Sequence, residues 1–195
     1  MMRTIIATTA LFTSIGTTTL ADMARYELDV EHTAVYFTID HIGYAKTLGI
    51  FTDLNGGFMY DVDTQNLSDV AVTIQAASVN TFNEARDGHV RNRDFLNVPE
   101  HPEITFVASG GTPEGDTRGT VTGDLTILGI TQPVTLDVTL NKVAAYPFGH
   151  KREVLGLSMS TTIKRSDFGM TYGVGNGLVG DEVTINIETE AMKME

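Results

Sequence analysis

The chain has 195 residues and a formal net charge of −12, and it contains neither cysteine nor tryptophan. This charge repels nucleic acid and anionic surfaces over about one Debye length, roughly 8 Å at physiological salt, so we expect no nucleic-acid partner. The lack of cysteine excludes disulfides, thiol catalysis and zinc sites built on thiolates.

Residues 1–21 are predicted to form a secretory signal peptide. A short basic start ending at Arg3 precedes a Thr-rich apolar run, and small residues lead up to Ala21, just before the acidic Asp22. The run is too short for a spanning helix, which needs about 20 apolar residues. We therefore predict a soluble periplasmic protein without stable membrane insertion, in which residues 22–195 form a single domain.

Alternation of apolar and polar residues dominates the sequence from Tyr26 onward, which is typical of half-buried strands. Together with residues 54–62, this pattern predicts about eight strands. The apolar residues that share a face within successive segments are Val35, Phe37 and Ile39, then Val70, Val72, Ile74 and Ala76, then Ile104, Phe106 and Ala108, then Val121, Leu125 and Ile127, then Val134, Leu136, Val138 and Leu140, then Leu155, Leu157, Met159 and Ile163, and finally Val183, Ile185 and Ile187.

An all-β fold follows, with antiparallel strands that are apolar on one side and polar on the other. So many consecutive strands must close into a barrel or stack as a sandwich to remove their edges. A barrel of about eight strands can be filled by its side chains or can hold one small ligand. The pattern favours a barrel but leaves a sandwich open.

One short helix, at about residues 82–92, is predicted to interrupt the strands. Thr81 and Glu84 have the spacing of a capping box, and Asp87 and Arg91 are placed for a helical ion pair. The helix is expected to end before Pro99 and to lie across one end of the barrel, near its mouth.

No catalytic or metal-binding motif stands out. The five histidines, His32, His41, His89, His101 and His150, lack the short spacings of zinc sites, so we expect no metal site. Neither a nucleophile elbow nor an S-x-x-K motif is present, so we expect no catalytic residues and no enzyme. The glycine-rich residues 168–180 are interpreted as a mobile loop before the last strand.

Cations gather near the predicted helix. Arg86, Arg91 and Arg93 fall within eight residues of one another. We expect them to pair with neighbouring carboxylates and fix the helix, with binding of an anionic head group as the alternative. The carboxylates available for such pairs are Glu84, Asp87, Asp94 and Asp167.

Five stretches together resemble the YceI-like family of bacterial exported proteins. They are YELDVEHTAVYF from Tyr26, HIGYAKTLGIF from His41, RDGHVRNRDFLN from Arg86, GDLTILGITQPVTL from Gly123 and RSDFGM from Arg165. They span nearly all of residues 22–195. The resemblance implies a lipocalin-like antiparallel barrel that encloses a long apolar tunnel, although the Gly-x-Trp motif of true lipocalins is impossible in a chain without tryptophan.

The resemblance also implies a ligand, namely one polyprenyl lipid, prenylated quinone or fatty amide, with no cofactor required. On this basis we expect seven residues to line the tunnel: Phe37, Ile39, Phe58, Phe106, Leu125, Leu136 and Phe168. Arg86, His89 and Arg91 are hypothesised to lie within reach of the head group.

The function expected from the sequence is therefore that of a periplasmic carrier that buries the tail of an amphiphilic lipid. One alternative is a metal-dependent or small-substrate enzyme of the envelope, in which His32, His41, His89 or His101 converge around a cleft with carboxylates. Another is a stress-related structural protein with a filled core. The sequence leaves open whether the protein is a homodimer.

Overall fold

The computed structural model describes residues 23–195, which form one closed antiparallel barrel. The predicted signal peptide lies outside the described residues. Each barrel strand pairs with the next, and the last pairs with the first, so the sandwich alternative is excluded. In order around the barrel, the eight strands are β1 (Ala24–Leu28), β4 (Leu54–Tyr60), β5 (Leu67–Gln75), β7 (Glu103–Ala108), β9 (Arg118–Ile127), β10 (Ile130–Ala145), β11 (Glu153–Lys164) and β12 (Val179–Lys193).

The long strand β12 closes the barrel by pairing with two segments in turn. Its last residues pair with β1, through Leu28↔Ala191, and residues within 179–188 pair with β2 (Ala34–His41), through Phe37↔Ile185. The short 3-10 helix η1 (Val30–His32) separates β1 from β2. β2 then pairs with β3 (Ala45–Phe51), which pairs with β6 (Val79–Asn80). These three strands continue the barrel wall on one side.

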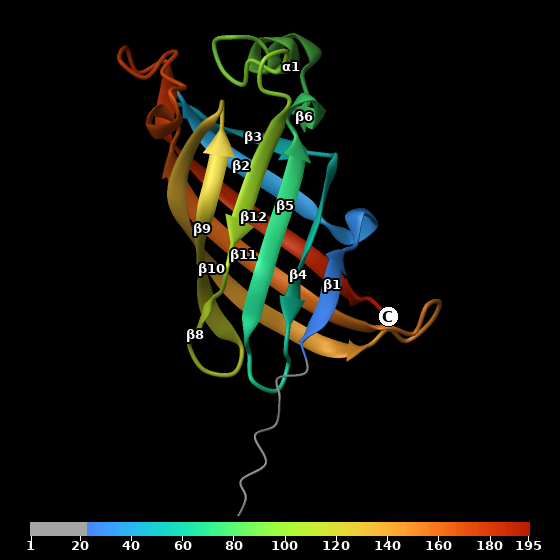
Figure 1. The fold of residues 1–195 in the computed structure, drawn as a ribbon. Coiled ribbons are helices and arrows are strands. Elements are labelled where there is room, and N and C mark those ends of the chain that lie inside the picture. Colours follow the sequence, from blue (N-terminus) through green and yellow to red (C-terminus); the bar gives the residue numbers. More distant parts are fainter. Residues whose placement is uncertain (1–22) are drawn as a thin grey trace, which may run out of the picture.

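The two ends of the barrel differ (Figure 1). The helix α1 (Glu84–Arg91) and the 3-10 helices η2 (Ala76–Ser78) and η3 (Arg165–Phe168) lie at one end, hereafter the helix end. The β4–β5 and β10–β11 turns and the short strand β8 (Thr112–Pro113) lie toward the other, hereafter the opposite end. In residues 23–195, no helix has the length and apolar character needed to cross a membrane.

Helix α1 begins later than predicted, and its cap is a different residue. Asn83 is the N-cap, and its side chain accepts a hydrogen bond from the Arg86 N–H at 3.0 Å. Phe82 has a φ of +65°, so the helix cannot include it. The predicted capping box is therefore wrong. The Thr81 hydroxyl instead donates to Asp87 Oδ1, at 2.5 Å.

The expected ion pairs of this helix are not formed. The salt bridges within residues 23–195 join His32 to Asp29, His89 to Asp94 and Lys193 to Glu153, and none includes an arginine. The Arg86 Nε donates to Thr81 Oγ1 at 2.8 Å, and its Nη2 donates to the Thr81 carbonyl. Hydrogen bonds to uncharged groups therefore fix the helix in place of the expected ion pairs.

Arg165 organises the glycine-rich segment that precedes β12. Its side chain is buried, at 2% exposure, and lies at the end of β11. Its guanidinium donates four hydrogen bonds of 2.7–3.0 Å to the carbonyls of Met170, Tyr172, Val179 and Gly180. Residues 169–178 form turns, as expected of a loop, but a single buried cation holds their backbone to the barrel.

Replacing Arg165 with Met is expected to destabilise the protein strongly. Four backbone carbonyls lose a charged donor, and each such bond contributes on the order of 1.5–3 kcal/mol singly, with much less than additive effect. We expect a loss of about 3–5 kcal/mol in the free energy of unfolding, measured by urea denaturation. The matched control is Arg93→Met, on an exposed side chain, which should change stability by less than about 0.5 kcal/mol. Equal stabilities for the two variants would contradict the assigned role.

Candidate ligand-binding cavity

The interior of the barrel is hollow. A cavity of about 800 Å³ runs inside it, and side chains from all eight barrel strands and from β2 line its wall. The buried core divides into two clusters, one around Phe168 and Leu125 toward the helix end and one around Tyr26 and Phe58. The structural-protein alternative predicts a filled core, and the cavity contradicts that expectation.

All seven residues that we expected in the tunnel lie on the cavity wall. They are Phe37, Ile39, Phe58, Phe106, Leu125, Leu136 and Phe168. Six of them lie on strands, where alternation turns every second side chain inward, whereas Phe168 lies in η3. That these side chains contact a ligand stays a prediction.

Two glycines leave space for two phenylalanine rings of the wall. Gly49 is the cross-strand partner of Phe37, and a Cβ atom at position 49 would lie 2.3 Å from the Phe37 ring. A Cβ at Gly123 would lie 2.6 Å from the Phe106 ring in the same way. Each ring therefore occupies space that a neighbouring side chain would otherwise fill. Because each ring lies over a residue without a side chain, it projects less far into the lumen than it would beside a larger residue.

Polar groups reach the cavity at its helix end. Arg86 and His89, both from α1, line the wall there. The His89 ring packs edge-on against Phe95 and Tyr172, with ring centroids 5.1 Å apart in each pair. Its Nε2 lies 3.0 Å from Asp94 Oδ2. This packing joins α1 to the glycine-rich segment across the mouth.

Arg91 does not lie where the head-group hypothesis placed it. It is not among the cavity-lining residues, and its guanidinium points to backbone instead. Its Nε donates to the Ala77 carbonyl at 2.8 Å, and its Nη2 donates to the Val79 carbonyl at 2.7 Å. Arg91 therefore ties α1 to η2 and β6, and its guanidinium is not placed to meet a head group.

The cavity reaches exposed residues at both ends. At the helix end, its wall includes the exposed side chains of Ile42, Tyr172 and Leu178. At the opposite end, it includes the exposed residues Thr112, Asp116 and Arg118. Sequence reasoning missed these mouth residues because none belongs to an alternating strand pattern. The aromatic Tyr172 inside a glycine-rich segment was the one available signal.

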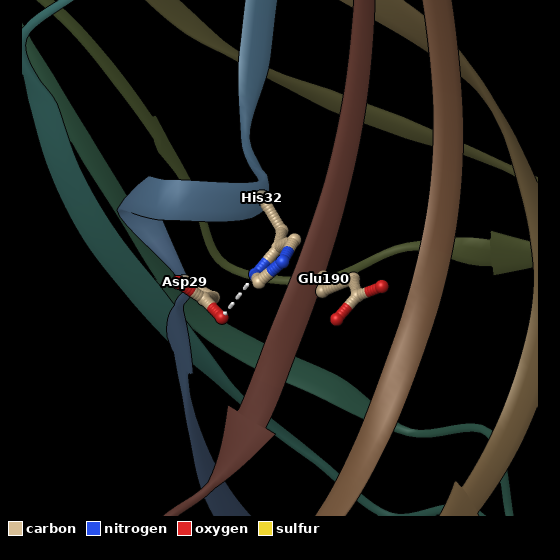
Figure 2. Close-up of side chains that lie close together, drawn as sticks. All are labelled: Asp29, His32 and Glu190. Carbon is tan, nitrogen blue, oxygen red and sulfur yellow. Dashed lines mark hydrogen bonds and ion pairs between the residues drawn. The ribbon is translucent and has the colours of Figure 1, made fainter. Parts of the chain in front are cut away.

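A different group of side chains lies near η1 (Figure 2). Within the described residues, Asp29, His32 and Glu190 form the only group of three side chains placed to hold a metal ion, with ligand atoms within 4.8 Å of one another. One imidazole and two carboxylates are ligands that zinc accepts. The group contains one histidine, so within residues 23–195 the convergence of His32, His41, His89 or His101 that the enzyme alternative requires does not appear as a three-ligand group.

The geometry of this group accounts for two pKa shifts. His32 Nδ1 lies 2.8 Å from Asp29 Oδ2, and this hydrogen bond, together with the charges of Asp29 and Glu190, raises the pKa of His32. Burial opposes the ionisation of Asp29, but hydrogen bonds from His32 and from the Glu31 N–H outweigh it and lower the pKa of Asp29. The pair is thus most favourable when His32 is protonated and Asp29 is ionised.

Asp29→Asn is expected to lower the pKa of His32 toward its ordinary value of about 6.5. The amide keeps an acceptor for the Glu31 N–H but loses the charge. Because the folded-state pKa of His32 is raised, the stabilisation from its protonated form is present below about pH 6.5 and is lost as the pH rises through the folded pKa. An NMR titration of the His32 ring protons measures the shift. Asp137→Asn, at an exposed position of β10, is the control, and an unchanged His32 midpoint in Asp29→Asn would contradict the assignment.

Comparisons with known proteins cover most of the chain. The model of the YceI-like domain matches residues 26–191. A UPF0312 protein of Pseudomonas putida is 33% identical over 197 residues, covering 100% of both chains. A Salmonella arizonae protein named Protein YceI is 38% identical over 174 residues, which cover 88% of this chain and 90% of that protein.

Solved structures show the same architecture. The crystal structure of Burkholderia cenocepacia BcnA has a TM-score of 0.74 and 26% identity, over 85% of this chain and 99% of that chain. The YceI protein of Campylobacter jejuni has a TM-score of 0.73 and 31% identity, over 80% and 90% of the two chains. A polyisoprenoid binding domain from Saccharophagus degradans, at 15% identity over 88% of this chain and 99% of that chain, shares the fold with a TM-score of 0.64.

The same assignment follows from three observations. They are the sequence motifs, the closed eight-stranded barrel with the single α-helix of residues 23–195, and the match over residues 26–191. The chain belongs to the YceI-like family.

Proposed function

We propose that this protein binds one amphiphilic lipid, with the apolar tail inside the barrel, and carries it through the periplasm. The observation that carries the proposal is the cavity of about 800 Å³, whose wall is mainly apolar along the middle of the barrel. A pocket of this kind, apolar with a few polar groups at its ends, is typical of sites for small amphiphilic ligands. The polyisoprenoid binding domain of similar fold supports this class of ligand.

The dimensions of the barrel fit an extended chain. Strand β9 has ten residues. At about 3.3 Å per residue and a tilt of about 40°, it spans roughly 25 Å along the barrel axis. Burial of apolar surface contributes about 25 cal/mol per Å², so contact along such a length supplies most of the binding free energy. A polyprenyl lipid, a prenylated quinone and a fatty amide all present a tail of this type.

We place the head group at the helix end, near Arg86 and His89. Arg86 is exposed and lines the cavity, and its bonds to Thr81 fix the guanidinium beside the mouth. An anionic head group there gains charge-assisted hydrogen bonds. The tail then extends toward the opposite end, past Leu125 and Leu136.

We propose binding without chemical conversion, and no cofactor is required for it. Three of the polar side chains that reach the cavity at the helix end are engaged in structural contacts. Arg165 is bonded to four carbonyls, Thr81 donates to Asp87, and His89 is bonded to Asp94. Such an arrangement holds and orients a ligand, whereas catalysis needs a nucleophile or base free to reach it.

Leu125→Arg is expected to abolish lipid uptake, because the cation would have to share the lumen with the tail. Leu125 is buried at 8% exposure and lines the cavity. The measurement is native mass spectrometry after incubation with a polyprenol in detergent. Thr122→Arg adds the same charge on the exposed face of the same strand and should leave uptake unchanged.

A second variant covers the case in which Leu125→Arg does not fold. Val121→Trp places an apolar indole in the lumen without burying charge, since Val121 lines the cavity. It should fold and bind less polyprenol, or only shorter chains. Full uptake by folded Leu125→Arg and by Val121→Trp would show that the tail does not occupy this cavity.

Arg86→Met is expected to weaken binding of a polyprenyl diphosphate by about 10–100-fold, because a charge-assisted hydrogen bond contributes about 1.5–3 kcal/mol. Binding of the corresponding polyprenol, which has no charge, should change much less. Competition against a fluorescent polyene lipid measures both affinities.

The same experiment at the opposite end sets the orientation of the ligand. Arg118 is exposed and lines the cavity there, so Arg118→Met is the matched control. Selective loss of the diphosphate in Arg86→Met places the head group at the helix end. Selective loss in Arg118→Met alone would reverse the orientation.

A further inference from the structure

Large exposed apolar side chains gather at the helix end of the barrel. The group comprises Ile42, Tyr44, Phe82, Ile130, Tyr172 and Leu178, with exposed fractions from 39% for Ile130 to 89% for Tyr44. We name these six residues the apolar rim. Scattered exposed apolar residues are normal on a protein surface, but a concentration at one end marks an interaction site.

The rim residues come from separate turns that the strand register brings to one end. Val179 pairs with His41, so Leu178 lies next to the β2–β3 turn that carries Ile42 and Tyr44. Ile130 begins β10 at the β9–β10 turn, and its side chain lies 3.1 Å from the position that a Cβ on Gly169 would take. Phe82 follows β6, beside α1.

The rim surrounds one mouth of the cavity. Ile42, Tyr172 and Leu178 are exposed and also line the cavity. The opposite mouth, by contrast, is lined by Thr112, Asp116 and Arg118. A lipid tail that enters at the helix end therefore meets apolar side chains before it reaches the lumen, whereas a tail at the opposite end meets polar ones.

Two rim residues hold unfavourable backbone conformations. Ile42 has a φ of +57° and Phe82 a φ of +65°, in a region that β-branched and bulky residues rarely adopt. Glycine or asparagine would adopt this backbone conformation at a lower energetic cost, and neither would expose an apolar side chain. Backbone strain at a residue whose apolar side chain is exposed points to a role for that side chain in binding.

We infer that the apolar rim docks reversibly on the surface of a lipid bilayer, so that the ligand passes directly between the bilayer and the cavity. This inference rests on the proposed function. Tyrosine and aliphatic side chains are suited to a membrane interface. The tyrosine ring contacts the acyl region while its hydroxyl contacts water, and the aliphatic side chains contact the acyl region. Passage at a docked mouth spares the tail an exposure to water.

Charge does not supply the attraction. The protein is acidic, with a net charge of −12, and the helix end carries Asp40, Asp94 and Asp167 as well as Arg86 and Arg93. Docking through apolar side chains therefore predicts transfer from neutral bilayers that varies little with ionic strength, whereas attraction by cations to anionic lipid would weaken steeply with salt.

The test uses Tyr44→Ser combined with Phe82→Asn. Neither residue lines the cavity, so the wall for the ligand is unchanged. The control is Val107→Ser combined with Phe148→Ser, which removes two exposed apolar side chains, at 48% and 64% exposure, that lie outside the rim. The probe is a fluorescent polyprenol, presented either in phosphatidylcholine vesicles or in detergent micelles.

From vesicles, the rim variant should take up the probe about ten-fold more slowly than the control variant, as expected from partial loss of two apolar contacts. From detergent, both variants should bind as much probe as the original protein. Equal rates from vesicles for the two variants would overturn the inference. A rate that falls steeply between roughly 0.05 and 0.5 M salt, a range over which the Debye length shrinks about three-fold, would also overturn it. If the original protein binds no probe from either source, the proposed function itself fails.

Discussion

The pairing of β12 with both β1 and β2 is the constraint on which the rest of the structure depends. A sheet of this many strands must remove its edges, and here a single strand does so by pairing its last residues with β1 and its earlier part with β2. The shift from one partner to the other is made at η1, where Asp29 N–H donates to the Glu190 carbonyl at 2.8 Å. Closure gives every inward side chain a neighbour on the wall, and it also encloses the lumen.

The enclosed space shows that the interior is built for something other than maximal packing. Protein cores are normally packed as densely as organic crystals, and empty volume costs stability. This barrel instead divides its buried core into two clusters and rests Phe37 and Phe106 over glycines. A ligand that fills the cavity recovers those lost contacts, so stability and binding are coupled through the same side chains.

Much of the barrel could be predicted from the sequence because the alternation that defines each strand is a local pattern. Alternation along a strand fixes which side chains face inward, and for this reason the pattern alone identifies Leu125 and Leu136 as inward-facing residues, which line the cavity. The helix could be predicted near its true position for a similar reason, since residues 82–96 break the alternation. Closure as opposed to a sandwich was not decided by local pattern, because it depends on which distant strands pair.

The remaining details depend on competition between partners that sequence spacing does not reveal. Thr81 has the spacing of a capping residue, but Asp87 takes its hydroxyl and Asn83 takes the cap. Arg91 has the spacing of a helical ion pair, but two backbone carbonyls lie within its reach. Asp29, His32 and Glu190 meet only because β12 returns to β1, so no motif in the sequence contains all three.

The clamp formed by Arg165 has a consequence for the kind of ligand that the protein can select. One guanidinium holds the glycine-rich turns and the start of β12 together, and so restrains this side of the aperture at the helix end. A restrained aperture sorts ligands by their cross-section and by their branching. The cavity also reaches solvent-exposed residues at the opposite end, so the barrel does not limit the length of a tail there. Under the proposed function, the barrel therefore selects a chain by its thickness and tolerates differences in its length.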